Sequence, residues 1–151
     1  MEKIKTNIYD SANAASVVVA DKIAEQINNA AVEGRSFVLG LATGSTPLGV
    51  YRELISKVRK GEISFKNTYS FNLDEYYGIG PEHPESYRRF MDRHFFSQID
   101  IPPENTFVPD GLIPRSDLLT YCKSYEKQIS EHGGIDVQLL WIGRTGHIGF
   151  N

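Results

Sequence analysis

The fold class follows from the stretch at residues 36–47, SFVLGLATGSTP. Its first part, residues 36–42, is mostly apolar, which is typical of a strand buried on both faces of a parallel sheet. A polar turn at 43–47 comes next, and apolar side chains then recur at helical spacing from Pro47 to about Lys60. This order predicts a strand, a tight loop and a helix in succession.

The same alternation continues on both sides of this unit. Helices are expected at 10–32, 86–98 and 116–132, strands at 68–73 and 135–142, and an ordered connection at 101–111. Alternating strands and helices predict an α/β fold with a mainly parallel sheet and helices on both faces, a Rossmann-like three-layer sandwich. The 151 residues fit a single domain. In such a sheet the ligand lies beyond the carboxyl ends of the strands.

The sequence also predicts, for two of these helices, whether particular side chains face the core or the solvent. The last expected helix places Cys122 on its apolar stripe, which predicts a small core residue. The helix before it carries three arginines close together, and these are expected to form a solvated face: Arg88, Arg89 and Arg93.

Composition narrows the function classes. The chain has a net charge of −3 and 40% hydrophobic residues, so it is an ordinary globular chain without the basic excess of a general nucleic-acid binder. Its one cysteine cannot form an internal disulfide, and no apolar run reaches the roughly 18 residues of a membrane span. The N-terminal residues lack the apolar core of a signal peptide. We expect a cytoplasmic protein whose partner is a small molecule, and not nucleic acid or a membrane. The sequence leaves open whether the protein forms a homo-oligomer.

The loop after the first strand has the chemistry of an anion site. Gly44 lets the backbone bend and lets a ligand approach, while Ser45 or Thr46 can cap the following helix and Pro47 suits its first turn. Backbone N–H groups and the positive end of the helix dipole would then face a phosphate. A capped turn without a ligand is the alternative. The Walker lysine is absent, so a nucleoside triphosphate is not implied.

Two acids follow the second strand. Asp74 and Glu75 are adjacent, so their side chains should point in different directions and at most one should face a ligand. A carboxylate beside a substrate carbon can act as a general base. The alternatives are that both are solvated loop acids, or that one of them caps a turn.

The segment after the last strand, residues 143–151, places three glycines around His147. An imidazole titrates near neutral pH and suits proton transfer. A structural histidine bonded to a backbone carbonyl is the alternative. No spacing of His, Cys and Asp matches a metal site, so neither a metal nor an organic cofactor is expected.

Four segments occur in an order and spacing that resembles the glucosamine-6-phosphate deaminase family: LATGSTP at 41–47, FNLDEY at 71–76, HPESY at 83–87 and GHIGFN at 146–151. The sister family, the 6-phosphogluconolactonases, has similar phosphate and Gly-His loops. Tyr76 and the continuation after the Gly-His pair favour the deaminases.

The resemblance implies conversion of glucosamine 6-phosphate and water to fructose 6-phosphate and ammonia without a cofactor. It implies that Asp74 is the base that takes the C2 proton and returns it at C1, and that His147 assists ring opening. The 6-phosphate would be held by Gly44, Ser45 and Thr46. Three further residues would border the site: Thr43, Glu75 and Thr145.

The chain departs from the family pattern at two places. Thr145 stands where the family usually has Asp or Asn, and a threonine cannot supply a carboxylate to His147. The family continues after Asn151 with Glu-Pro, whose glutamate is catalytic. We therefore expect residues 1–151 to be a single sugar-phosphate domain from a longer protein, with the sheet truncated at its C-terminal side. A non-catalytic sugar-phosphate sensor on the same scaffold and a 6-phosphogluconolactonase are the alternatives.

Overall fold

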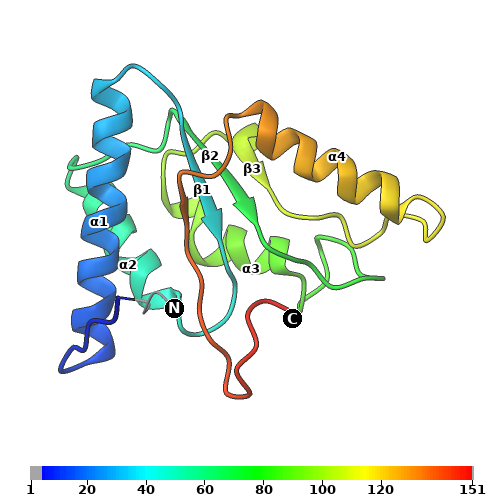
Figure 1. The fold of residues 1–151 in the computed structure, drawn as a ribbon, viewed down its shortest axis with the longest axis horizontal. Coiled ribbons are helices and arrows are strands. Elements are labelled where there is room, and N and C mark those ends of the chain that lie inside the picture. The colour runs from blue at the N-terminus through cyan, green and yellow to red at the C-terminus, as the bar shows by residue number, and fades with distance from the viewer. Residues whose placement is uncertain (1–4, 151) are drawn as a thin grey trace.

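A parallel sheet organises the chain, of which the computed structural model describes residues 5–150. Its strand order is β3-β2-β1-β4, and every neighbouring pair is parallel (Figure 1). The strands are β1 (Phe37–Leu41), β2 (Thr68–Asn72), β3 (Thr106–Phe107) and β4 (Val137–Gln138). The predicted parallel α/β class is confirmed.

The register between β1 and β2 sets where the candidate loops begin. All five residues of β1 are buried, as the apolar run predicts. Phe37 pairs with Thr68 and Leu41 with Asn72, so the two strands end at the same level. The loops that follow β1 and β2 therefore start side by side at one edge of the sheet.

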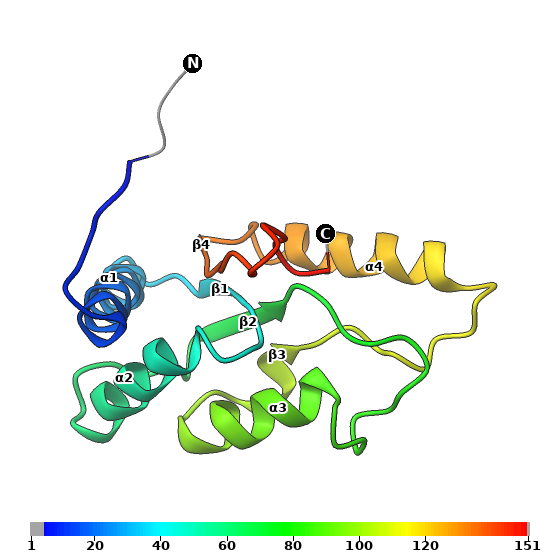
Figure 2. The same ribbon diagram turned by 90° about the horizontal axis from the view of Figure 1, so that it is seen from below.

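Helices cover the sheet in layers, with α2 and α3 on one side and α4 on the other (Figure 2). The helices are α1 (Ala12–Val32), α2 (Leu48–Arg59), α3 (Tyr87–His94) and α4 (Leu118–Glu131). The Ser11 hydroxyl caps α1 by accepting from the Ala14 N–H at 3.1 Å. The main core lies between α1, α2, α3 and the sheet, where the rings of Tyr51 and Phe95 stack at 4.6 Å.

Three predicted elements have different bounds. The expected helix at 86–98 ends at His94, because Phe95 turns its backbone to φ −144° and sends its ring into the core; a 3-10 turn at Phe96–Gln98 follows. The expected strand at 135–142 pairs only at Val137–Gln138. The connection at 101–111 contains β3, a two-residue strand too short to show a periodic pattern.

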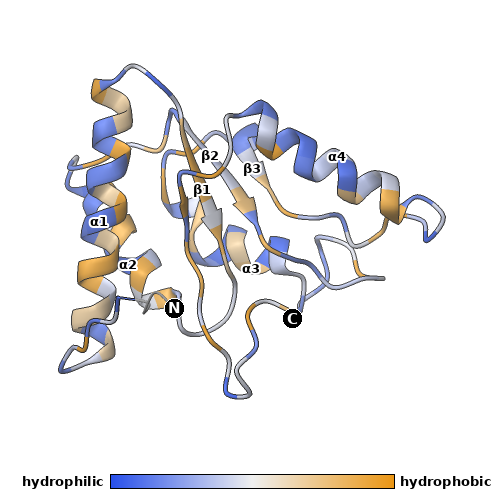
Figure 3. Cartoon of the chain, in the orientation of Figure 1, coloured by the Kyte–Doolittle hydropathy of each residue, from blue (hydrophilic) through white to orange (hydrophobic). Residues whose placement is uncertain are grey.

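The helix expected at 116–132 is present as α4, but the prediction that Cys122 is a core residue is wrong, because no residue of this helix is buried and Cys122 is exposed. Figure 3 shows that α4 is largely polar compared with β1. The helix meets the sheet mainly through Tyr125, whose ring lies 5.7 Å from that of Phe71 and whose hydroxyl donates to the Asn72 carbonyl at 2.9 Å. Cys122 takes no part in this contact between α4 and the sheet. Within residues 5–150, no helix has the length and apolarity to cross a membrane.

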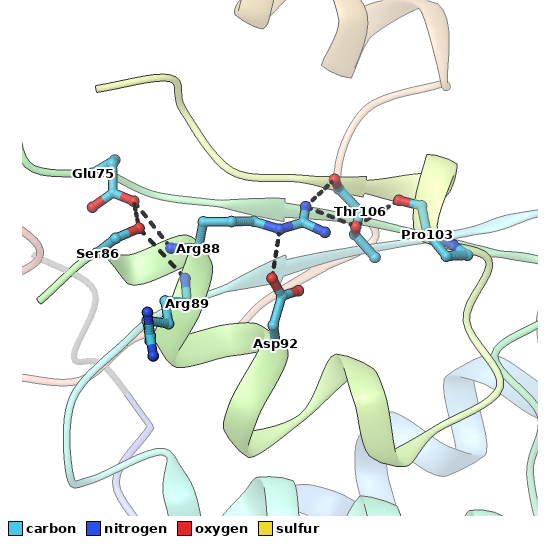
Figure 4. Close-up of polar contacts among 7 residues, drawn as sticks. All are labelled: Glu75, Ser86, Arg88, Arg89, Asp92, Pro103 and Thr106. Carbon is cyan, nitrogen blue, oxygen red and sulfur yellow. Dashed lines mark hydrogen bonds and ion pairs between the residues drawn. The ribbon is translucent and has the colours of Figure 1, made fainter. Parts of the chain in front are cut away.

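The prediction of a solvated arginine face is wrong for Arg88. Its guanidinium donates to the carbonyl and hydroxyl oxygens of Thr106 at 3.0 and 2.9 Å and pairs with Asp92 at 3.1 Å (Figure 4). Arg89 and Arg93 are exposed, as expected. Arg88 therefore fastens α3 to the edge strand β3.

We expect the chain 1–151 to associate with itself through the β4 edge. Leu140 and Ile142 follow this edge strand and are 48% and 74% exposed. An apolar sheet edge is a template for another chain, and lysines on it oppose such pairing. The double variant Leu140→Lys, Ile142→Lys should shift the chain toward monomer in sedimentation velocity. Leu119→Lys, on the exposed face of α4, is the control and should leave the distribution unchanged; a wild-type chain that stays monomeric at all concentrations would contradict this expectation.

Candidate active site

The three predicted loops meet at the carboxyl ends of the strands. The segment after β4 folds back over the loop after β2, so that the ring of Phe150 lies 5.0 Å from Tyr76 and 5.6 Å from Tyr87. At its other end, His147 lies beside Trp141, with the ring centroids 5.4 Å apart. The segment 143–150 thus reaches from the β4 side of the sheet to the β2 side.

The loop after β1 presents an uncapped helix. Pro47 is the N-cap residue of α2 and makes no side-chain cap, so the predicted capping by Ser45 or Thr46 is wrong. Both hydroxyl residues are exposed, and Gly44 has φ +107°, a backbone conformation that favours glycine. The N–H groups at the start of α2 therefore keep their capacity to bind an anion.

A cavity of about 410 Å³ opens between the starts of α1 and α2 and the segment after β4. The lining of this cavity includes Ser45, Thr46 and Trp141. It also includes Arg52, a cation that no pattern in the sequence indicates as part of a site. Asp74 is not among the lining residues. The structure therefore places the two predicted phosphate-binding hydroxyls in one cavity and the candidate base outside it.

Trp141 connects this cavity with the histidine. Its indole lies 3.4 Å from the position that a Cβ atom on Gly44 would take, so the ring packs directly on the loop after β1. The same indole also makes an edge-on contact with the ring of His147. Trp141 is the one tryptophan of the chain, and its fluorescence therefore reports on this region.

Asp74 and Glu75 point in different directions, as the strand geometry predicts. Asp74 is half-buried under the segment after β4, where the backbone N–H of Phe150 donates to its carboxylate. Burial raises the pKa of Asp74 above its ordinary value of 3.8, the negative charge of Glu75 raises it further, and the hydrogen bond from Phe150 opposes both. A carboxylate held in this way is a stronger base than one in water.

Glu75 caps α3, which matches the structural alternative considered for this pair of acids. Its carboxylate accepts from the Ser86 hydroxyl at 2.7 Å and from the backbone N–H of Arg88 at 3.0 Å (Figure 4). It also accepts from the backbone N–H groups of Tyr76 and Tyr87 at 2.9 and 2.8 Å. Ser86 is fully buried. Glu75 thus ties the loop after β2 to the start of α3 and borders the site through its neighbours.

The raised pKa of Asp74 predicts a pH effect on stability. The folded chain holds this proton more tightly than the unfolded chain, so the contribution of Asp74 to stability is present below pH 3.8 and is lost as the pH rises through the raised pKa. The free energy of unfolding of Asp74→Asn, relative to wild type, should therefore increase from pH 4 to pH 7 in urea titrations. Asp117→Asn, an exposed acid at the start of α4, is the control. A constant difference between Asp74→Asn and wild type would contradict the expectation.

His147 has a hydroxyl partner. Thr145 Oγ1 lies 2.8 Å from His147 Nδ1, so the threonine orients the ring although it cannot supply a carboxylate. The ring lies directly over Gly143, where the Cβ of any other residue would sit 2.0 Å from a ring carbon. A backbone hydrogen bond of 2.8 Å from Gly143 N to His147 O closes the turn. Asn151, the last residue of the GHIGFN segment, lies outside the described residues.

Tyr87, the last residue of the HPESY segment, has no role that the sequence predicts. It begins α3, its ring stacks on Phe150, and its hydroxyl bonds to those of Tyr76 and Thr43. The signal available in the sequence was its place two residues after a proline-rich turn, at a helix start. Among residues 5–150, no group of three or more His, Cys, Asp or Glu side chains could hold a metal ion.

Fold and loops define a class: a parallel α/β domain whose polar residues gather at the carboxyl ends of β1, β2 and β4. The chain belongs to the family of glucosamine-6-phosphate isomerases and 6-phosphogluconolactonases, whose family model matches residues 10–149. The resemblance drawn from the four sequence segments is thereby confirmed.

Individual relatives agree with this assignment. A glucosamine-6-phosphate deaminase of Thermoanaerobacter sp. (strain X514) is 50% identical over 148 residues, which is 98% of this chain and 54% of the relative. Glucosamine-6-phosphate deaminase 2 of Bacillus subtilis (strain 168) is 54% identical over 114 residues, 76% of this chain and 45% of the relative. The chain thus spans about half the length of these curated relatives.

Solved structures show the same fold. A monomeric glucosamine-6-phosphate deaminase superposes with a TM-score of 0.89 at 39% identity, covering 97% of this chain and 58% of that one. A 6-phosphogluconolactonase from Thermotoga maritima superposes with a TM-score of 0.73 at 26% identity, covering 89% of this chain and 58% of that one.

Proposed function

We propose that the protein carrying this chain converts glucosamine 6-phosphate and water to fructose 6-phosphate and ammonia. The observation that carries the proposal is Asp74, a half-buried carboxylate at the carboxyl end of β2 whose pKa is raised by burial. The relatives named above, which are called glucosamine-6-phosphate deaminases, support the choice of substrate. We propose the cytoplasm as its location and class it as a hydrolase of amino-sugar metabolism.

The anion end of the substrate is assigned to the loop after β1. Gly44 lets the phosphate approach the backbone, and the free N–H groups at the start of α2 point toward it. Ser45 and Thr46 add hydroxyl donors from the cavity wall. This anchor fixes the far end of the sugar, so that C1, C2 and the ring oxygen can be held near fixed acid and base groups.

The proton transfers are assigned to the other two loops. His147, oriented by Thr145, assists opening of the sugar ring at the ring oxygen. Asp74 then removes the proton on C2 and returns it at C1, which turns the amine-bearing C2 into an imine carbon. Water adds to this carbon and the C–N bond breaks, giving the C2 ketone of fructose 6-phosphate and ammonia. Residues 1–151 form the sugar-phosphate domain in this proposal, and no cofactor takes part.

Ammonia release from glucosamine 6-phosphate by the complete protein tests the proposal. Measurable release that is lost in Asp74→Asn supports it. Binding of a hexose 6-phosphate without turnover would instead favour a sensor. Hydrolysis of 6-phosphogluconolactone without ammonia release would favour the lactonase activity for which the other half of the family is named.

A further inference from the structure

One side chain, that of Tyr87, touches all three candidate loops. Its ring lies 4.9 Å from Tyr76, in the loop after β2, and 5.6 Å from Phe150, in the segment after β4. Its hydroxyl lies 3.4 Å from the Tyr76 hydroxyl and makes a second hydrogen bond with the side chain of Thr43, in the loop after β1.

The backbone of Tyr87 is fixed from two directions. Glu75 accepts from its N–H at 2.8 Å, which holds the start of α3 against the end of β2. Arg88, the next residue, donates to Thr106 and so holds the same helix turn against β3 (Figure 4). The aromatic side chain therefore projects from a rigid point of the fold toward three loops that begin on different strands.

The pKa of the Tyr87 hydroxyl is raised above its ordinary value of 10.0. Burial is the largest cause, the hydrogen bond with Tyr76 raises the pKa further, and the hydrogen bond with Thr43 opposes both. The partner residue Thr43 is itself 5% exposed. A protonated phenol between two hydroxyls can donate one hydrogen bond and accept another, which fixes the two loops at one separation.

We propose that Tyr87 is a positioning residue that sets the spacing between the phosphate loop and Asp74. The inference rests on the proposed function, because it takes the first loop as the anchor and Asp74 as the base. The hydroxyl acts through Thr43 and Tyr76 and not on the reacting atoms. Without it, a substrate still binds by its phosphate, while C2 is presented to Asp74 at a less favourable distance.

The variant Tyr87→Phe separates this role from a purely structural one. It keeps the ring stacked on Phe150 and removes only the two hydroxyl contacts. A misplacement of about 1 Å costs on the order of 10²-fold in rate, so kcat of the complete protein should fall by about 10-fold or more while KM changes little. Tyr77→Phe is the matched control, because Tyr77 lies in the neighbouring turn and is 59% exposed; it should leave both constants unchanged.

A double-mutant cycle with Thr43→Val identifies the path of the effect. The two single variants break the same hydrogen bond, so the double variant should lose no more in kcat than the worse single variant. The inference would be overturned if the loss in kcat of the double variant equalled the product of the two single losses. A Tyr87→Phe protein with wild-type kcat would overturn it as well.

A second readout keeps the inference separate from the proposed function. Absence of turnover in the wild-type protein would count against the deaminase proposal, and the same cycle is then measured as the free energy of unfolding in urea. Non-additive losses of stability would support the link between Tyr87 and Thr43, whereas additive losses or no loss would overturn it.

Discussion

Asp74→Asn is expected to abolish deaminase turnover while leaving sugar-phosphate binding intact. Asparagine keeps the size and the hydrogen-bonding capacity of the side chain under Phe150, but it cannot accept the C2 proton. Loss of a positioned general base costs typically about 10²–10⁴-fold in rate. The measurement is ammonia release from glucosamine 6-phosphate by the complete protein, with fructose 6-phosphate affinity measured by isothermal titration calorimetry.

Asp117→Asn provides the control for this experiment, because Asp117 is exposed at the start of α4 and its carboxylate accepts a hydrogen bond from the Ser116 hydroxyl at 2.9 Å. It should have wild-type kcat and KM. Retention of more than a tenth of wild-type turnover by Asp74→Asn would show that another group removes the proton.

Glu75→Ala should produce the largest loss of stability among variants of the site. The substitution leaves the buried Ser86 hydroxyl and the backbone N–H groups at the start of α3 without their acceptor. An unsatisfied buried donor costs roughly 1–3 kcal/mol, and loss of an N-terminal cap costs about 0.5–2 kcal/mol. Urea unfolding of the variant should therefore show a decrease of at least about 2 kcal/mol in the free energy of unfolding.

Two further variants make the interpretation of Glu75→Ala specific. Glu85→Ala removes an exposed glutamate just before the same helix and should have nearly wild-type stability. Glu75→Gln retains one acceptor oxygen and should fall between wild type and Glu75→Ala. Equal stability of Glu75→Ala and Glu85→Ala would contradict the capping role.

Local patterns were sufficient to predict much of this fold. The run at 36–42 is apolar at nearly every position, and β1 is buried at all five of its residues. By contrast, β3 is a two-residue strand that depends on pairing with β2 and on Arg88 reaching Thr106, contacts between residues far apart in the chain. An apolar stripe also could not show whether a facing layer covers it, which is why Cys122 was placed in a core that α4 does not have.

The candidate site was predictable in its parts but not in its connections. Strand alternation indicated that Asp74 and Glu75 diverge, and the structure confirms it. The sequence could not show that the Thr145 hydroxyl lies beside His147 or that Trp141 packs on Gly44, because both depend on how segment 143–150 folds back. The expected cap from Ser45 or Thr46 failed for a similar reason: at the start of α2 the N-cap position falls on Pro47.

The fate of the hydrogen on C2 of the substrate shows whether Asp74 transfers a proton from C2 to C1. The complete protein is incubated with glucosamine 6-phosphate that carries deuterium at C2, and the products are examined by NMR and by an ammonia assay. We expect that deuterium leaves C2 and appears at C1 of fructose 6-phosphate or in water, with one ammonia released for each ketose formed and no transfer in Asp74→Asn. Deuterium that remains on C2 of a bound but unreacted sugar would contradict it.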